Sequence, residues 1–274
     1  MVPPRPHRAY SAVVKPWLRR LDCAALPFWV AGEARLNAFM NECSQAVIFD
    51  LTQTLVNSAD GFRAAEKAAQ EQIADDLNPS SPDEFMAIYR QVKTRFQDAS
   101  QASRADIWKD VYHRYGREPD ARRLSRWEDE YWDRVEALTS LFPETERVLD
   151  VLGERYPLGL VTNIQHSNRH LLDAFPDLKR RFGACVLAGA RGMPAKPAPE
   201  PFRQCLQDLG VDPAATVYVG DDWRIDIQGA QAAGLRVVWL QHALLRRTFP
   251  QAETDVPIIT SLEPLLNIES LLDN

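Results

Sequence analysis

The sequence has few cysteines, no excess of positive charge and no long apolar run, and each of these features excludes a class of protein. Its four cysteines show neither a CxxC spacing nor a histidine at metal-ligand intervals. We therefore expect reduced thiols in a cytoplasmic protein, not a disulfide framework or a zinc site. The net charge of −6 gives no basic field to attract nucleic acid. No apolar run approaches the roughly 20 residues of a membrane span, so we expect no membrane partner either.

Residues 1–40 differ in composition from the rest of the chain. They open with the proline-rich, basic stretch VPPRPHR and continue to an apolar piece from Cys23 to Ala31. That piece resembles a secretory signal, but it is short, Pro27 interrupts it and acidic residues flank it. We expect a poorly ordered extension instead. Met40 could itself be a start codon, in which case the extension would be incidental.

Apolar residues make up 45% of the chain, and they are arranged around one stretch, AVIFDLTQTLV at 46–56. An uninterrupted apolar run of this kind is typical of a strand that is buried on both faces, as in a parallel sheet. Asp50 ends the run, at the carboxyl end of the strand, where open α/β sheets bind their ligands. A carboxylate at this position is a nucleophile, a metal ligand or the N-cap of the next helix.

From residue 60 to residue 138 the sequence is strongly charged and follows a helical pattern. Proline-containing breaks at 78–82 and 116–119 divide it into four expected helices, at Gly61–Leu77, Pro82–Ala99, Ala105–Tyr115 and Asp120–Leu138. Four aromatic residues recur near helical spacing, which is more typical of the core of a helical bundle than of a stacking platform. They are Trp108, Trp127, Tyr131 and Trp132.

After Phe142-Pro143 the pattern changes to alternating strands and helices. Strands are expected at Leu158–Thr162, Ala184–Leu187, Thr216–Val219, Arg236–Leu240 and Pro257–Ile259, and helices at Thr145–Arg155, Ser167–Ala174, Pro201–Leu209, Ile225–Ala233 and Leu262–Leu272. Such alternation is typical of a parallel sheet with helices on both faces. The sequence therefore predicts an α/β, Rossmann-like core from residues 41–59 and 139–274, with a helical domain of residues 60–138 inserted into it.

Polar residues follow the expected strands in a way that would gather them at one edge of the sheet. Asp50 ends the first strand, Thr162 and Asn163 end the next, and Lys196 lies in a loop before Pro197. The acidic residues of VGDDWRID come after Thr216–Val219; they are Asp221, Asp222 and Asp226.

In their order along the chain, these residues match the four motifs of the haloacid dehalogenase-like hydrolase superfamily. The motifs are a nucleophilic Asp in DxDxT, a Thr or Ser after the second strand, a Lys and an acidic GDxxxxD. Asp50, Thr162, Lys196, and Asp221 with Asp226 occupy these places. The stretch from about residue 45 to residue 274 most resembles the phosphatase branch with a helical cap of the C1 type after the first motif. Nucleotide and sialic acid 9-phosphate phosphatases are the most similar kinds.

The resemblance implies Mg²⁺-dependent hydrolysis of a small phosphorylated metabolite. Asp50 would attack phosphorus and form an aspartyl-phosphate. Mg²⁺ would bind Asp50, Asp221 and the backbone carbonyl of Thr52, with Asp222 or Asp226 as a further ligand or a supporting group.

Three more residues would contact the phosphoryl group. Lys196 would neutralise its charge and that of Asp50, and Thr162 would donate a hydrogen bond to it, beside Asn163. The residues alone also allow plainer interpretations: Asp222 as a helix N-cap, Lys196 as a surface lysine and Thr162 as ordinary strand-end polarity.

The chain departs from the phosphatase pattern at Thr52. Two residues after the nucleophile, the phosphatases carry an Asp that protonates the leaving group and later activates water. A threonine does neither near neutral pH, and general acid–base help contributes about 10²–10⁴ in rate. P-type ATPases also carry Thr there, but this chain lacks their membrane spans.

We therefore expect a phosphohydrolase that is slow or limited to good leaving groups. Two alternatives remain open. One is hydrolysis of a carbon–halogen bond by the same nucleophile, which needs no metal. The other is a phosphate-binding or regulatory protein of the same fold without turnover.

Overall fold

The computed structural model describes residues 45–99, 103–164, 171–190, 192–245, 248–249, 255–268 and 271. The chain divides after Phe39 into two units, and all described residues belong to the second, Met40–Asn274. The extension expected at residues 1–40, and with it the alternatives of a signal peptide and of a start at Met40, lies outside the described residues.

A six-stranded parallel sheet forms the core, and β1 (Ala46–Phe49) lies inside it. The strand order is β5-β4-β1-β6-β7-β8, and every neighbouring pair is parallel. The other strands are β4 (Leu158–Asn163), β5 (Ala184–Ala188), β6 (Thr216–Gly220), β7 (Arg236–Leu240) and β8 (Ile258–Ile259). Because β4 and β6 flank β1, their carboxyl ends adjoin that of β1. The α/β fold class predicted from the sequence is confirmed.

The apolar residues of β1 alternate between two hydrophobic cores, one on each face of the sheet. Val47 and Phe49 belong to one core, and Ala46 and Ile48 belong to the other. All four are fully buried. Side chains alternate along a strand, so only a strand covered on both faces keeps an unbroken apolar run. This explains why the run at 46–49 contains no polar residue.

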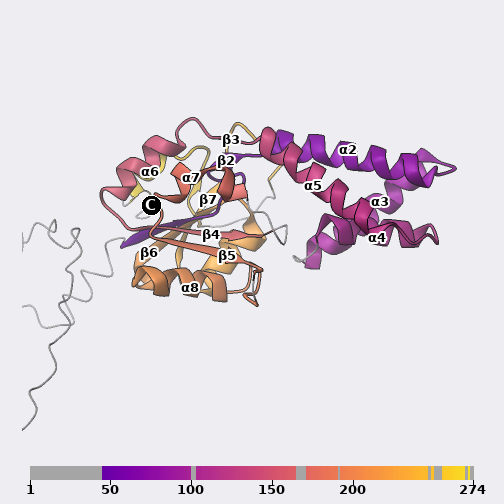
Figure 1. Ribbon diagram of the computed structural model, residues 1–274. Helices are drawn as coiled ribbons and strands as arrows, with labels where there is room; N and C mark the ends of the chain where they lie inside the picture. The colour runs from indigo at the N-terminus through magenta and orange to yellow at the C-terminus, as the bar shows by residue number, and fades with distance from the viewer. Residues whose placement is uncertain are drawn as a thin grey trace, which may run out of the picture. The chain divides into compact units, whose positions relative to one another are not determined.

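Helices cover both faces, as Figure 1 shows for α6 and α8 on opposite sides of the sheet. The core that contains Val47 includes residues of α6 (Thr145–Gly153), α7 (Pro176–Lys179) and the 3₁₀ turn η6 (Glu263–Asn267). The core that contains Ile48 includes residues of α8 (Glu200–Leu209) and α9 (Gln228–Ala232).

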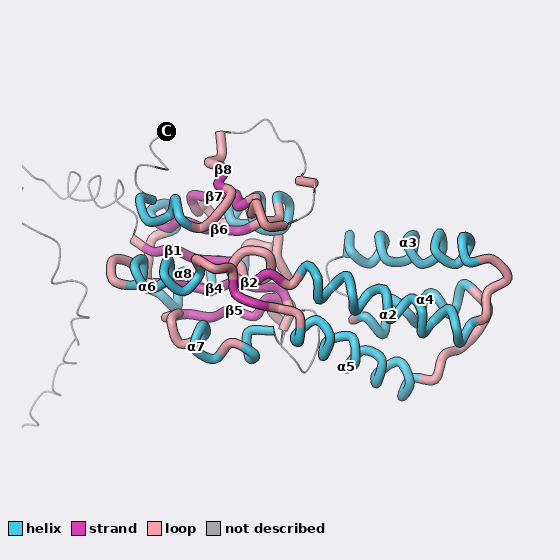
Figure 2. Tube along the Cα trace, turned by 90° about the horizontal axis from the view of Figure 1, so that it is seen from above, coloured by secondary structure: helices cyan, strands magenta, loops and turns pink. Residues whose placement is uncertain are grey.

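The inserted helical domain consists of α2 (Ala59–Leu77), α3 (Pro82–Ala99), α4 (Arg104–Arg114) and α5 (Ala121–Ala137). Each bound lies within two residues of the sequence prediction. Figure 2 shows these four helices lying together. Trp108, Tyr131 and Trp132 are buried in their common core and Trp127 packs against it, which confirms the bundle-core interpretation. A Cβ on Gly61 of α2 would lie 2.6 Å from the carbonyl oxygen of Val135 on α5, so the two helices approach each other too closely for a larger residue.

The connections to the helical domain run side by side, which the sequence did not indicate. The chain reaches the domain through β2 (Val56–Asn57) and leaves it through β3 (Ser140–Leu141), and the two strands pair antiparallel. The carbonyl oxygen of Leu55 accepts hydrogen bonds from the backbone N of Phe142 (3.2 Å) and from the hydroxyl of Thr145 (2.8 Å). These bonds fix both connections to the core.

Three sequence expectations about helices differ from the structure. The helix expected at Ile225–Ala233 is a π turn, η5 (Trp223–Ile227), followed by α9. Of the helix expected at Ser167–Ala174, the described part is the 3₁₀ turn η3 (Leu171–Ala174), and α7 was not expected. The helix expected at Leu262–Leu272 begins as the 3₁₀ turn η6, and Ile268 and Leu271 after it are α-helical. None of the described helices is long and apolar enough to cross a membrane.

Candidate active site

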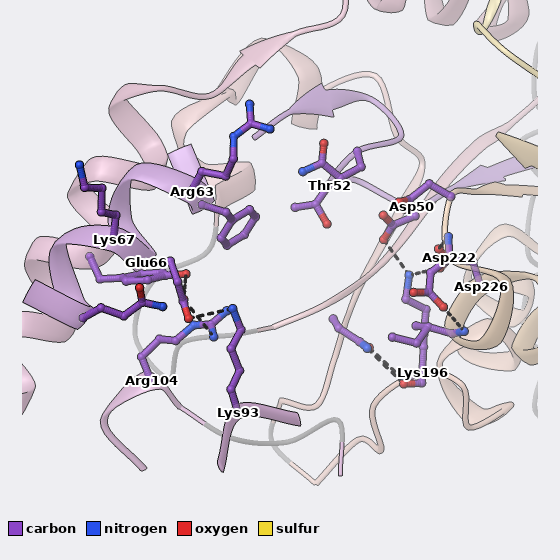
Figure 3. Close-up of a pocket in the computed structure, with 17 residues that line it drawn as sticks. Asp50, Thr52, Arg63, Glu66, Lys67, Lys93, Arg104, Lys196, Asp222 and Asp226 are labelled. Carbon is purple, nitrogen blue, oxygen red and sulfur yellow. Dashed lines mark hydrogen bonds and ion pairs between the residues drawn. The ribbon is translucent and has the colours of Figure 1, made fainter. Parts of the chain in front are cut away.

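The expected gathering of polar residues is present at the carboxyl end of β1. A cavity of about 530 Å³ opens there, and it is lined by residues of both the sheet edge and the helical domain (Figure 3). From the sheet edge come Asp50, Thr52, Gln53, Asn163, Lys196, Asp221, Asp222, Ile225 and Asp226. Asp50 is held in place because its backbone N donates to the carbonyl oxygen of Val219 on β6, at 3.0 Å.

Lys196 is the most constrained charged group of the site. Its side chain is buried, and its ammonium Nζ contacts four oxygens. Two are carboxylate oxygens, Oδ1 of Asp50 and Oδ1 of Asp226, each at 2.7 Å. The other two, each at 2.9 Å, are the carbonyl oxygen of Val161 and the hydroxyl of Tyr218. The structure therefore excludes the interpretation of Lys196 as a surface lysine.

Burial and charge act in opposite directions on this ion pair. Burial lowers the pKa of Lys196, but the nearby Asp226 and Asp50 raise it by more, so the pKa lies above its ordinary value and the ammonium keeps its charge. Burial raises the pKa of Asp50 to about 6, with Asp226 adding to the rise and Lys196 opposing it. An ammonium beside two carboxylates thus keeps a buried aspartate available in its ionised form.

The acidic loop after β6 brings Asp221 and Asp226 to the same place. Both are buried, and the indole N–H of Trp239 donates to the carbonyl oxygen of Asp221 at 3.0 Å. Asp226 lies against Gly220: a Cβ added to Gly220 would be 2.5 Å from the Cβ of Asp226. A glycine is therefore required at position 220, because a larger residue would displace the carboxylate of Asp226 that Lys196 contacts.

The donor atoms suit a divalent cation. Carboxylate oxygens of Asp50, Asp221 and Asp226 lie within 4.8 Å of one another, and Mg²⁺ prefers oxygen ligands. Asp226 already accepts from Lys196 and Tyr218 with Oδ1, and from the backbone N of Asp222 (3.0 Å) with Oδ2. Asp50 and Asp221 are therefore better placed to bind a metal, and Asp226 to support them.

Asp222 serves the local backbone. Its Oδ1 accepts from the backbone N of Ile225 at 2.8 Å, which is the N-cap arrangement that the sequence left open. Asp222 does not belong to the cluster of described carboxylates formed by Asp50, Asp221 and Asp226. Its assignment as a metal ligand stays a prediction.

Asn163 and Thr162 end β4 and take different places. The side-chain amide of Asn163 pairs with the backbone of Lys196, accepting from its N at 2.8 Å and donating to its O at 3.1 Å. It therefore fixes the loop that carries Lys196, and it lines the cavity. Thr162 is buried and is not among the described residues that line the cavity. Its hydrogen bond to a phosphoryl group remains a prediction.

The turn after Asp50 puts Thr52 at the cavity. Backbone N–H groups of Thr54, Leu55 and Val56 all donate to the carbonyl oxygen of Leu51, which closes a tight turn. Thr52 lines the cavity. That it replaces the carboxyl group of the phosphatase pattern stays a prediction. The Thr54 hydroxyl lies 3.5 Å from Oδ1 of Asp221, so the last threonine of DLTQT supports the acidic loop.

Tyr218 and the residues of the helical domain were not found from the sequence. Tyr218 is fully buried in β6 below Lys196, and in the sequence it is indistinguishable from a core aromatic. The far wall of the cavity is formed by Phe62, Arg63, Glu66, Lys67, Gln70, Lys93, Arg104 and Tyr131. They come from four different helices, and no spacing in the sequence brings them together.

Comparison with known proteins shows the family to which the chain belongs. A model of the haloacid dehalogenase-like hydrolase family matches residues 45–234. A phosphoglycolate phosphatase of Neisseria meningitidis is 30% identical over 202 residues, covering 69% of this chain and 77% of that protein. The rat N-acylneuraminate-9-phosphatase is 26% identical and covers 84% and 91%. The crystal structure of a 2-haloacid dehalogenase from Pseudomonas syringae superposes with a TM-score of 0.59 over 83% of this chain and 98% of that one. Its 24% identity indicates a common fold alone.

Proposed function

Because this chain belongs to the haloacid dehalogenase-like hydrolases, in their phosphatase branch, we propose that it hydrolyses a small phosphorylated metabolite through an aspartyl-phosphate on Asp50, with Mg²⁺ as cofactor. The observation that carries the proposal is the ion pair at 2.7 Å between Lys196 and Asp50, next to the carboxylates of Asp221 and Asp226. The named activities of its relatives, on phosphoglycolate and on N-acylneuraminate 9-phosphate, support a phosphate ester of a small molecule as substrate.

The proposed reaction has two displacements at phosphorus. A carboxylate oxygen of Asp50 attacks phosphorus, and the bond between phosphorus and the ester oxygen breaks. The leaving alkoxide takes a proton from water. A water molecule then attacks phosphorus of the aspartyl-phosphate and gives up a proton to the hydroxide left by the first step. The bond between phosphorus and the Asp50 oxygen breaks, inorganic phosphate leaves and the carboxylate of Asp50 is restored. Dividing one hard displacement into two easier ones is the benefit of a covalent intermediate.

The residues around Asp50 control charge during the attack. A carboxylate and a phosphate repel each other, and the ammonium of Lys196, 2.7 Å from Asp50, offsets that repulsion. Asn163 holds the loop that carries Lys196. Mg²⁺, bound by Asp50 and Asp221 and by the proposed carbonyl of Thr52, would supply further positive charge to the phosphoryl oxygens. We also propose that Thr162 donates a hydrogen bond to the phosphoryl group.

Thr52 sets the expected limit on the rate. An alkoxide leaves poorly unless an acid protonates it, and the hydroxyl of Thr52 is no acid near neutral pH. The missing general acid–base contribution is about 10²–10⁴ in rate, or roughly 3–5 kcal/mol of barrier. Turnover should therefore be slow with alkyl phosphates and faster with esters whose leaving group is stable as an anion.

Thr52 also favours one alternative, a protein that binds phosphate without turnover. The same residues, Asp50, Lys196 and Asp221, would serve a binding protein. Halogen hydrolysis has less support, because that reaction needs no metal, whereas carboxylate oxygens of Asp50, Asp221 and Asp226 lie together as a metal site requires.

Phosphate release tests the proposal against both alternatives. The full chain is incubated with p-nitrophenyl phosphate and with a panel of sugar phosphates, nucleotides and acyl phosphates, with Mg²⁺ and with a chelator. We expect multiple turnovers with Mg²⁺, loss of activity with chelator and recovery when Mg²⁺ is added back. Phosphate binding without release would support the binding protein, and full activity in metal-free buffer would contradict the proposed cofactor.

A further inference from the structure

The wall of the cavity that belongs to the helical domain contains a group of three charged side chains from three helices. Glu66 of α2 lies between Lys93 of α3, whose Nζ is 2.8 Å from its Oε1, and Arg104 of α4, whose Nη1 is 3.9 Å from its Oε2. The hydroxyl of Tyr131 on α5 donates to Oε2 of Glu66 at 3.4 Å. Figure 3 shows Lys93 and Arg104 converging on Glu66 at one end of the cavity, away from Asp50.

These side chains are only partly accessible to water. The exposed fractions are 14% for Glu66, 17% for Arg104 and 28% for Lys93. The guanidinium of Arg104 also lies 5.0 Å from the ring centre of Tyr131, which limits its freedom. Charges held in place and partly removed from water interact with a ligand more strongly than mobile charges at the surface.

Among the described residues of this wall, Lys93 and Arg104 share the carboxylate of Glu66, so positive charge is in excess there. The nearby Glu128 is not among the described residues that line the cavity, and it accepts from the backbone N of Arg104 at 2.6 Å, where it serves the start of α4. The remaining two cations of the wall, Arg63 and Lys67, are 58% and 78% exposed and pair with Asp60 and Glu71 of their own helix. The excess charge that faces the cavity is therefore held by Lys93 and Arg104.

The two ends of the cavity thus have opposite character. The sheet edge carries carboxylates that suit a metal, and the far wall carries two cations on a rigid support. We propose that Lys93 and Arg104 form a second anion-binding site, which binds a carboxylate or a second phosphate at the end of the substrate remote from the ester that is cleaved. This inference rests on the proposed function and narrows it to phosphate esters that carry another negative charge.

Glu66 has a positioning role in this arrangement. Glu66 contacts both cations and accepts a hydrogen bond from the hydroxyl of Tyr131, so it holds Lys93 and Arg104 toward the cavity. It offers one negative charge for their two positive charges. The same contacts would also be found if Glu66, Lys93 and Arg104 only held α2, α3 and α4 together. The two interpretations differ in what happens to substrates with and without the second anion.

Matched pairs of esters provide the test. 3-Phosphoglycerate and glycerol 3-phosphate differ by a carboxylate in place of a hydroxymethyl group, and propane-1,3-diol bisphosphate and its monophosphate differ by a second phosphate. Hydrogen bonds to charged groups contribute about 1.5–3 kcal/mol, so kcat/KM of the wild type should favour the more anionic member by about 10- to 150-fold. The pair with the larger preference identifies the anion.

Three variants show where the preference arises. Lys93→Met and Arg104→Met remove one charge each and should lower kcat/KM about tenfold for the anionic member while leaving the other within about twofold. Lys109→Met is the matched control, because Lys109 is 51% exposed on α4, pairs with Glu118 and is not a lining residue of the cavity. It should leave the preference unchanged. Arg104→Lys, which keeps the charge, should retain part of the preference even if Arg104→Met proves unstable.

The outcomes separate this inference from the proposed function. Hydrolysis of p-nitrophenyl phosphate without any preference within the pairs, or an equal loss for both members in the variants, overturns the anion site and leaves the phosphatase intact. If no ester is hydrolysed, the proposed function fails, and calorimetric binding of the same pairs to the Asp50→Asn protein decides the anion site. Tighter binding of the anionic member that is lost in Lys93→Met supports it, and equal binding contradicts it.

Discussion

The ammonium of Lys196 lies 2.9 Å from the hydroxyl of Tyr218 and 2.7 Å from Oδ1 of Asp50, the proposed nucleophile. An ammonium has three protons, and here it contacts four oxygens. The Tyr218 hydroxyl is the one group among the four that also donates, lying 3.0 Å from Oδ1 of Asp226 and 3.2 Å from the carbonyl of Val161. Tyr218 therefore positions Lys196 and Asp226 relative to each other.

We expect Tyr218→Phe to lower kcat by about three- to tenfold and to leave KM nearly unchanged. Three acceptors remain for three protons, so the loss is that of one hydrogen bond, about 1 kcal/mol. Lys196→Met should lower kcat by about 10²–10³-fold or more, because it removes the positive charge that offsets repulsion between Asp50 and the phosphate. It also leaves the buried carboxylates of Asp50 and Asp226 without this cation. Steady-state kinetics with p-nitrophenyl phosphate measures both. Equal losses in the two variants would contradict a positioning role.

Asp50→Asn should reduce turnover to background, because it keeps the size of the side chain and removes the attacking charge. A lost metal ligand would give the same result, so trapping of the wild type is the decisive measurement. Mass spectrometry of protein quenched during turnover, or reduction of the intermediate with borohydride, should locate the adduct on Asp50. An adduct on another residue would show that Asp50 is not the nucleophile.

Thr52→Asp should restore a carboxyl group that can protonate a leaving oxygen. The gain should be largest for alkyl phosphates, with a ceiling of about 10²–10⁴-fold, and smaller for p-nitrophenyl phosphate, which leaves readily as an anion. Imperfect placement would reduce the gain. The ratio of kcat/KM between the two substrate types measures the effect.

The added charge of Thr52→Asp could also disturb the metal, so Mg²⁺ affinity is measured in parallel by calorimetry. Thr52→Asn is the control, because asparagine has nearly the same shape as aspartate but carries an amide instead of a carboxyl group. A folded Thr52→Asp protein that binds Mg²⁺ normally and gains nothing on alkyl phosphates would show that Thr52 does not occupy the acid position.

Glu144 supports the point where the chain re-enters the core, and its effect on stability should depend on pH. Burial raises its pKa, but hydrogen bonds from its own backbone N–H and that of Leu262, and the pairing with His242 at 3.0 Å, outweigh burial and hold the pKa below its ordinary value. A lowered pKa in the folded state stabilises the protein above the pKa of the unfolded chain, roughly 4.3. That stabilisation is lost as pH falls through the folded value.

Glu144→Gln should therefore lower the free energy of unfolding by about 1–3 kcal/mol near pH 7, and the difference from wild type should shrink as pH falls below the unfolded pKa of roughly 4.3. Urea unfolding followed by tryptophan fluorescence, repeated from about pH 2.5 to about pH 8 so that both pKa values are covered, measures this. Glu154→Gln, at an exposed residue near the end of α6, is the control and should change little. A difference that stays constant with pH would show that the charge of Glu144 is not responsible.

Much of the core could be predicted because local pattern and tertiary environment agree there. The run at Ala46–Phe49 is apolar on both faces, and both faces are buried. Asp50, Lys196, Asp221 and Asp226 could be placed together because parallel neighbouring strands put their carboxyl ends side by side. The four helices of the inserted domain were found from their helical pattern and from the proline-containing breaks between them.

The rest depends on contacts between distant segments, which local patterns do not contain. The π turn at Trp223–Ile227 carries Asp226, whose two oxygens are committed to Lys196, Tyr218 and the N of Asp222. A regular helix was expected because the sequence does not show those partners. In the sequence Tyr218 is one aromatic residue of a strand, and only the structure shows its contact with Lys196. Likewise, Lys93 and Arg104 read as surface charges of two helices, and only the structure shows that both lie near Glu66.

The pairing of β2 with β3 allows the inserted helices to change in evolution without a change in the sheet. Because the entry and exit of the inserted helices are already neighbours, lengthening the insert costs little closure entropy, about 0.6 kcal/mol for each doubling in length. The segment between them can therefore be exchanged for another without changing how the sheet is connected or where Asp50 and Lys196 lie. The helices that carry the proposed anion site and the sheet edge that carries Asp50 and Lys196 can therefore change independently in evolution.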